Sequence, residues 1–220
     1  MIEEGLELSK RIIGAHNTNG FCGATVTGRR GVGKSSYSLR VAYEIYVHLG
    51  YTPNNAWRKA LSVLKFEIKD VIDFLKASAQ APEQEYLLVW DDVGCFASSS
   101  MYFTDFHLVQ SLKSVMDTIR TSCNGLILTT PGQSGMLGLL KQYDDLLIEV
   151  RHTARGGSYR SAYAYQFRTL PSGKRLCKKK FVDAFSVRLP TWVYIEYNQM
   201  RKDANIRGVQ HLEEIIKKDD

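Results

Sequence analysis

The residues from 28 to 35 have the types and the spacing that bind phosphate. They read Gly28-Arg29-Arg30-Gly31-Val32-Gly33-Lys34-Ser35 and fit the pattern G-x-x-x-x-G-K-[ST] without a departure. Glycines let the backbone curl so that successive N–H groups face an anion. Lys34 would then reach the β and γ phosphates of a nucleoside triphosphate, and the Ser35 hydroxyl would bind Mg²⁺. Ser36, in the helix that follows, completes the predicted binding segment.

Two neighbouring carboxylates form a second candidate site. Asp91 and Asp92 follow the apolar residues from 87 to 90, which read Leu-Leu-Val-Trp. A continuous apolar run predicts a strand that is covered on both faces, as in a central parallel sheet. Ligands of α/β folds bind at the carboxyl edge of such strands. Both carboxylates are therefore predicted at a ligand site, although Asp92 also has the type of a turn residue before Gly94.

Together these two motifs resemble the Walker A and Walker B motifs of P-loop ATPases. The resemblance implies that ATP and Mg²⁺ are the cofactors, that residues 28–36 bind the nucleotide, and that Lys34 is catalytic. It also implies that Ser35 and Asp91 hold the metal ion and that Asp92 is the base that polarises the attacking water. Many family members have glutamate at the position of Asp92, and aspartate is one methylene shorter. The N-K-x-D motif of guanine recognition is absent from the sequence, so ATP is expected rather than GTP.

The order of the elements around these motifs resembles the additional-strand class of P-loop ATPases, which includes the AAA+, RecA-like and FtsK/HerA-like families. In that class a strand between the two motif strands carries a polar residue that senses the γ-phosphate. The strand predicted at 126–130 ends in Thr129 and Thr130, and either threonine fits this role. Thr130 is taken as the catalytic candidate. Threonine is also common in strands because of its β propensity alone.

Arginine is the expected stabiliser of charge during phosphoryl transfer, and a neighbouring subunit often donates it. Three arginines lie near predicted strand ends or turns: Arg120, Arg151 and Arg155. The sequence does not choose among them, and Arg151 is placed first as the catalytic candidate. A homo-oligomer is expected as well, because an ATPase that acts as a DNA-directed motor or in replication needs oligomerisation.

The elements that position these residues alternate between helix and strand. Apolar periodicity predicts helices at 6–13, 35–49, 55–64, 68–79 and 106–120, and strands at 21–27, 86–90 and 126–130. From 146 onward, short alternating segments with turns at 155–158 and 171–174 predict an antiparallel meander. A last helix is expected at 192–202, with a charged helical end after Gly208.

The predicted fold class is therefore α/β. It is a P-loop NTPase fold with a mostly parallel central sheet flanked by helices, extended by a C-terminal antiparallel β-meander and a final helix. We expect a single ATPase domain over residues 1–220. Its core would occupy about 20–150, and the basic meander and the C-terminal helices about 146–220.

Basic residues concentrate in the predicted meander. The chain carries 29 Lys and Arg against 23 Asp and Glu, a net charge of +6. Five cations surround one predicted turn: Lys174, Arg175, Lys178, Lys179 and Lys180. The neighbouring predicted strands add further cations and aromatic residues: Arg155, Arg160, Arg168, Tyr159, Tyr163, Tyr165 and Phe167. Such a region can bind the DNA backbone and stack on unpaired bases. Alternatively, the aromatic residues form cross-strand pairs and the lysines protect a sheet edge.

Three features together are similar to small ATPases encoded by archaeal viruses and plasmids: the stretch Val-Trp-Asp-Asp-Val-Gly at 89–94, the strand end Thr-Thr-Pro at 129–131, and the basic hairpin region. That resemblance implies an ATPase that acts on DNA in replication or in genome packaging. Two alternatives stay open: an ATP-dependent switch or loader that acts on a protein partner, and a small-molecule kinase with residues 151–160 as its lid. The four cysteines show no metal-binding spacing. Because no apolar run is long enough to span a membrane and the first ten residues are acidic, we expect a cytoplasmic protein.

Overall fold

The structure is a computed structural model of the chain, and it describes residues 5–96, 106–132, 136, 138–143, 145–153, 157–169 and 175–219. The chain forms two compact units, Met1–Arg188 and Leu189–Asp220. The first unit contains the sheet and both predicted motifs, and the second contains one long helix. The expectation of a single domain stays a prediction.

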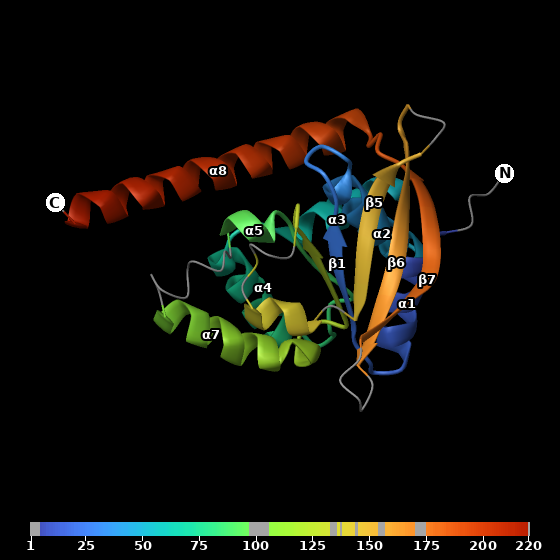
Figure 1. Cartoon of the computed structure of the whole chain (residues 1–220), viewed down its shortest axis with the longest axis horizontal. Coiled ribbons are helices and arrows are strands. Elements are labelled where there is room, and N and C mark those ends of the chain that lie inside the picture. Colours follow the sequence, from blue (N-terminus) through green and yellow to red (C-terminus); the bar gives the residue numbers. More distant parts are fainter. Residues whose placement is uncertain are drawn as a thin grey trace. The chain divides into compact units, whose positions relative to one another are not determined.

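In the described residues seven strands form one sheet, in the order β2-β3-β4-β1-β5-β6-β7 (Figure 1). The parallel part consists of β1 (Cys22–Thr27), β2 (Leu64–Lys65), β3 (Leu88–Trp90), β4 (Gly125–Thr129) and β5 (Leu146–His152). The last two strands, β6 (Tyr159–Thr169) and β7 (Arg175–Ser186), continue the sheet in antiparallel pairing. The predicted α/β class is confirmed, with its mostly parallel sheet and its antiparallel C-terminal strands. β4 lies between β1 and β3, where the resemblance placed the additional strand.

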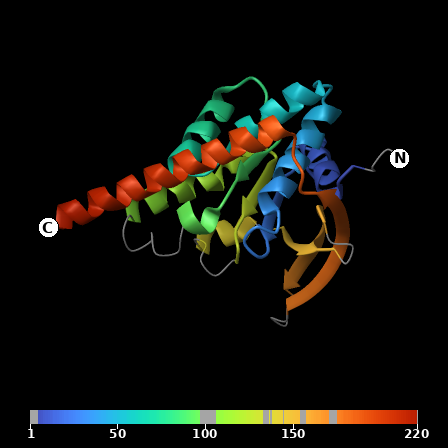
Figure 2. The same ribbon diagram turned by 90° about the horizontal axis from the view of Figure 1, so that it is seen from above.

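The helices of the first unit cover both faces of the parallel strands. They are α1 (Glu7–Asn17), α2 (Lys34–His48), α3 (Pro53–Ser62), α4 (Ile68–Gln80), α5 (Val93–Phe96) and α7 (Phe106–Asp117), with short 3₁₀ helices η1 (Ile119–Thr121) and η3 (Gly138–Tyr143). Buried residues of α4 and α7 pack with Leu88, Trp90, Leu126 and Leu128, which alternate along β3 and β4 toward one face. Helices α1 and α2 contact β1 and β4, and the central strands lie between the two groups (Figure 2).

Several element boundaries differ from those predicted, for physical reasons. β2 has two residues, too few to show any periodicity. The second unit consists of α8 (Thr191–Asp219), a continuous helix that passes through Gly208 without a break. A glycine in a helix interior costs only about 1 kcal/mol, which a long helix tolerates. The turn predicted at 171–174 lies outside the described residues, as do residues 155 and 156. No helix in the described ranges has the length and apolar character of a membrane span.

Candidate functional site

The predicted phosphate loop connects β1 with α2 and is shaped by glycine. Gly28, Gly31 and Gly33 have φ angles of 143°, 76° and 105°, a region that side chains other than glycine rarely adopt. A Cβ atom at Gly28 would lie 2.7 Å from the carbonyl oxygen of Val150, so the loop packs closely against β5. A Cβ atom at Gly33 would collide with Val187. Gly28 and Gly33 are therefore required both by the backbone conformation and by close packing.

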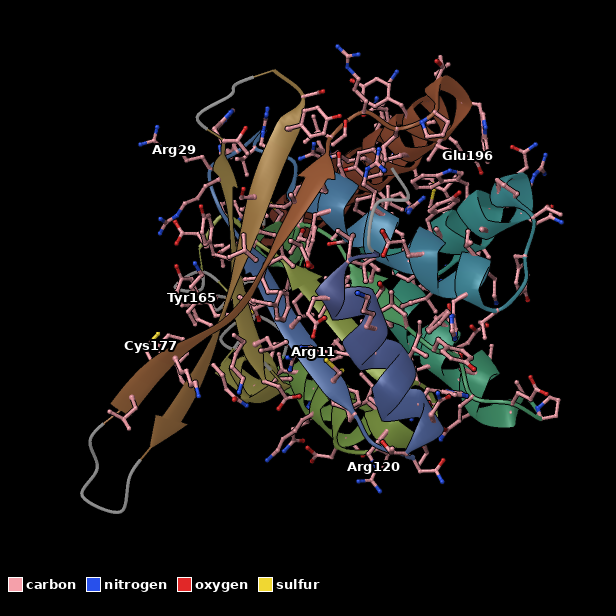
Figure 3. All side chains as sticks on the ribbon, turned by 90° about the vertical axis from the view of Figure 1, so that its right-hand side faces the viewer. Arg11, Arg29, Arg120, Tyr165, Cys177 and Glu196 are labelled. Carbon is pink, nitrogen blue, oxygen red and sulfur yellow. The ribbon has the colours of Figure 1, made fainter. Side chains whose placement is uncertain are left out.

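Lys34 is the first residue of α2 and is only 7% exposed. Its Nζ donates hydrogen bonds to the carbonyl oxygens of Gly28, at 3.2 Å, and Arg29, at 3.4 Å. The ammonium is thus held against the loop, where it can meet an anion bound by the loop N–H groups. The side chains of Arg29 and Arg30 are exposed, and Figure 3 labels Arg29 on the loop.

The two predicted metal ligands are in direct contact. Ser35 Oγ donates a hydrogen bond to Asp91 Oδ1 at 2.9 Å, which joins the start of α2 to the end of β3. Thr129 Oγ1, at the end of β4, donates to the same Oδ1 atom. Asp91 is fully buried. The structure therefore brings one residue from the loop motif, one from the acidic pair and one from the intervening strand to a single carboxylate oxygen.

Asp92 is the turn residue that separates β3 from α5. Its φ angle of 51° is left-handed, which is uncommon outside glycine and costs of order 1–3 kcal/mol. Its N–H donates to Thr129 Oγ1 at 2.9 Å, and its carbonyl oxygen accepts from the N–H of Cys95 at 2.8 Å. The backbone of Asp92 therefore forms a turn, as the alternative interpretation expected. The role of its carboxylate as a base stays a prediction.

The two threonines at the end of β4 have different partners. Thr129 contacts both members of the acidic pair, as described above. Thr130 is buried as well, but its Oγ1 donates to the carbonyl oxygen of Gly132 at 2.8 Å. The geometry therefore ties Thr129 to the carboxylates, whereas the hydroxyl of Thr130 binds the segment that follows the strand. The catalytic role predicted for Thr130 is untested by this arrangement.

Arg151 is held on the exposed surface of β5. Its Nη2 lies 2.6 Å from Glu149 Oε2, and its guanidinium lies 5.2 Å from the ring centroid of Tyr163 in β6. About half of the Arg151 side chain is exposed. These contacts do not involve the phosphate loop. Arg155, a second candidate, lies outside the described residues, and Arg120 lies in η1.

Arg160 is a residue of this site that the sequence analysis assigned elsewhere. It is 8% exposed, and its Nε donates a hydrogen bond to the carbonyl oxygen of Val32, in the phosphate loop, at 3.1 Å. The prediction that Arg160 belongs to a DNA-binding face is wrong for its side chain, which is buried. Arg160 is 128 positions from Val32 along the chain, so no local spacing could have indicated the contact.

The basic region lies on the β6–β7 hairpin. Lys178 and Lys179 are exposed, Lys180 is half-buried, Arg175 begins β7, and Lys174 lies outside the described residues. Lys179 Nζ lies 4.9 Å from the centroid of the Tyr163 ring, which Arg151 approaches from the neighbouring strand β5. These cation–aromatic contacts fit the cross-strand alternative. The exposed lysines and aromatic rings remain accessible on the hairpin, where Figure 3 labels Tyr165 and Cys177.

The glycine-shaped loop between β1 and α2, with β4 between the strands of the two motifs, makes this a P-loop NTPase fold. No protein-family model matches the chain. Among solved structures it is similar to the N-terminal domain of zonular occludens toxin from Neisseria meningitidis, with 13% identity and a TM-score of 0.44. That match covers 79% of this chain and 97% of the other. The strand order and the glycine loop identify the fold without this weak likeness.

Two virus proteins are similar to the chain in sequence. ORF286 of Acidianus two-tailed virus, an uncharacterized protein, is 31% identical over 126 residues, which cover 54% of this chain and 40% of ORF286. The uncharacterized protein B-251 of Sulfolobus spindle-shape virus 1 is 32% identical over 222 residues. This second match covers 98% of the chain and 88% of B-251. The expected likeness to virus proteins is confirmed, and the chain belongs to the same protein family as B-251.

Proposed function

We propose that this chain binds ATP with Mg²⁺ at residues 28–36 and hydrolyses it. The hydrogen bond of 2.9 Å between Ser35 and Asp91 carries the proposal. In P-loop enzymes the hydroxyl of the loop and the carboxylate after the second motif strand must meet at one metal ion. Here two residues that lie 56 positions apart in the sequence meet at hydrogen-bond distance.

The residues at this point suit Mg²⁺. This metal ion prefers oxygen ligands, keeps several waters, and is usually bound through one or two protein groups together with phosphate. Ser35 and Asp91 provide two such oxygens. Among the described residues, no group of three or more His, Cys, Asp or Glu side chains forms an all-protein metal site. When bound, Mg²⁺ would neutralise charge on the β and γ phosphates.

The chain's own groups would share the remaining work. The N–H groups of the loop and the ammonium of Lys34 bind and orient the phosphates. Asp92, beside the buried Asp91, accepts a hydrogen bond from the attacking water. Thr129 or Thr130 contacts the γ-phosphate or that water. Arg151 is exposed on β5, and we propose that it acts on the nucleotide of a neighbouring copy in a homo-oligomer.

DNA is the proposed partner of the β6–β7 hairpin. Lys178 and Lys179 are exposed there, and cations that neutralise phosphates give binding that weakens with added salt. Tyr159 and Phe167 are 53% and 38% exposed and supply rings for stacking on unpaired bases. The DNA-directed activity would belong to replication or to genome packaging.

A protein partner is the second candidate, because the hairpin also exposes aliphatic side chains. Leu176 and Val182 in β7 are 45% and 42% exposed, and neither side chain can bind a phosphate or stack on a base. A switch or loader would dock its partner on these residues. The kinase alternative gains no support, because both ends of its expected lid, Arg151 and Arg160, lie in strands.

The test is ATP hydrolysis without DNA, with single-stranded DNA and with duplex DNA, each at low and high salt. Wild type is compared with a variant that carries both Lys178→Ala and Lys179→Ala. Hydrolysis that rises with DNA at low salt, and less so in the double variant, supports the DNA-directed function. Hydrolysis that is indifferent to DNA at every salt concentration contradicts it and favours the protein partner. The preferred strandedness of the DNA would separate a role in replication from a role in genome packaging.

A further inference from the structure

Arg160 in β6 connects the C-terminal hairpin to the phosphate loop. Its Nε donates to the carbonyl oxygen of Val32, and its Nη1 donates to the carbonyl oxygens of Gly157, at 2.7 Å, and Tyr159, at 2.8 Å. The guanidinium therefore spans two segments that lie far apart in the sequence. A single planar group that makes bonds in two directions fixes the distance and the orientation between them.

The bond to Val32 controls the direction of the next N–H group. In a planar trans peptide the C=O and the N–H point in opposite directions. Holding the oxygen of Val32 on the side of Arg160 therefore turns the N–H of Gly33 to the other side. Val187, at the end of the hairpin, contacts Gly33 so closely that a Cβ atom would not fit there. The Val32–Gly33 peptide is thus fixed by two residues of the C-terminal region.

The charge of Arg160 is also unusual in this position. A buried cation is costly unless an anion or several hydrogen bonds compensate for it. In the described part of the chain, Arg160 forms no salt bridge, and all three of its hydrogen bonds go to neutral backbone carbonyls. A phosphate group on the neighbouring loop would supply negative charge beside it.

We propose that Arg160 is a positioning residue for the phosphates of the nucleotide. It holds the Val32 carbonyl so that the Gly33 N–H faces the phosphate, and it adds positive charge to the loop from outside the P-loop motif. The inference rests on the proposed nucleotide binding at residues 28–36. It also makes the hairpin, otherwise an addition to the parallel sheet, part of the nucleotide site.

The experiment measures the affinity for ATP with Mg²⁺ by calorimetry in wild type, Arg160→Ala, Arg160→Lys and Arg11→Ala, with the melting temperature of each variant. Arg11 is the matched control: it is an arginine that also contacts the hairpin, through Phe181 at 5.0 Å, and pairs with Glu7 away from the loop. Losing a hydrogen bond from a charged group is expected to weaken binding roughly ten- to hundredfold in Arg160→Ala. Arg11→Ala should bind as wild type does.

The Arg160→Lys variant separates the effect of holding the Val32 carbonyl from the effect of the positive charge. Lysine keeps the cation but cannot reach Val32 and Gly157 at once, so Arg160→Lys should recover only part of the affinity, even where Arg160→Ala folds poorly. In hydrolysis assays the KM for ATP should rise more than kcat falls, because the lost contact holds bound substrate and transition state alike. A general loss of folded protein would instead lower the binding stoichiometry at unchanged affinity.

The outcomes distinguish this inference from the proposed function. If wild type binds ATP through Lys34, and Arg160→Ala and Arg160→Lys bind ATP as tightly as wild type, only the role of Arg160 is overturned. Wild type that does not bind ATP overturns both. A selective loss of affinity in the two Arg160 variants, absent from Arg11→Ala, supports the positioning role.

Discussion

Thr129 Oγ1 donates a hydrogen bond to Asp91 Oδ1, the same oxygen that accepts from Ser35. The same threonine oxygen accepts the N–H of Asp92 at 2.9 Å. One hydroxyl thus holds the side chain of the first aspartate and the backbone of the second. Thr129 lies at the end of β4, and it reaches both aspartates because β4 pairs with β3 in the sheet. The topology of the sheet and the chemistry of the site are linked at this residue.

The partners of Thr129 predict the effect of removing its hydroxyl. Thr129→Val keeps the shape of the side chain but removes its hydrogen bonds to the Asp92 N–H and to Asp91 Oδ1, so we expect ATP turnover to fall about tenfold or more. Thr130→Val, one residue further on, should have a smaller effect, because its hydroxyl binds Gly132 instead. Steady-state hydrolysis of both variants is the measurement. The reverse ranking would assign the sensing role to Thr130.

Asp183 in β7 fixes the N-terminal helix, and its substitution should destabilise the first unit. Asp183 is 5% exposed, and its carboxylate accepts hydrogen bonds from the N–H groups of Glu7 and Leu8 at the start of α1 and from the Tyr37 hydroxyl at 2.6 Å. Asp183→Asn should lower the free energy of unfolding by about 1–3 kcal/mol, measured by denaturant titration. The control Asp73→Asn, at an exposed position of α4, should change it by less than about 0.5 kcal/mol.

Burial also gives Asp183 a pH dependence with a definite sign. Burial raises the pKa of this carboxyl above its ordinary value, and the hydrogen bonds from Tyr37 and α1 offset only part of the rise. Between the ordinary and the raised pKa, the folded chain binds a proton that the unfolded chain has released. This contribution to stability is present below about pH 4 and is lost as the pH rises through the raised pKa. The Asn variant should lose less stability over that window; an equal slope would contradict the assignment.

The four cysteines should divide into two reactive and two unreactive thiols. Cys95 and Cys177 are exposed, whereas Cys22 and Cys123 are buried. Burial raises the pKa of both buried thiols to about 12, so little thiolate forms near neutral pH. Labelling with a thiol reagent at pH 8 should modify two thiols quickly in the folded chain and four in denaturant. Rapid modification of a third thiol in the folded chain would show that the core opens.

The local parts of the site could be predicted from the sequence, and the distant parts could not. Residues 28–35 are contiguous, and their spacing alone fixes a loop between a strand and a helix. The choice between Thr129 and Thr130 needs the direction of each side chain, because successive strand residues point to opposite faces. Nothing in the sequence indicated that Arg160 contacts Val32, since this contact depends on how β6 lies beside the phosphate loop in the folded chain. Pairing with β3 makes a strand of Leu64–Lys65, a segment of two residues that is too short to show a pattern in the sequence.

The glycine loop and Lys34 are proposed to bind a nucleoside triphosphate. The most direct test is calorimetric titration of the purified chain with ATP, with and without Mg²⁺, in wild type and in Lys34→Ala. We predict one ATP per chain in the wild type, tighter binding with Mg²⁺, and at least about a tenfold loss of affinity when the ammonium is removed. Equal affinity in Lys34→Ala and wild type would exclude this role of Lys34, and no binding to the wild type would exclude the nucleotide site itself.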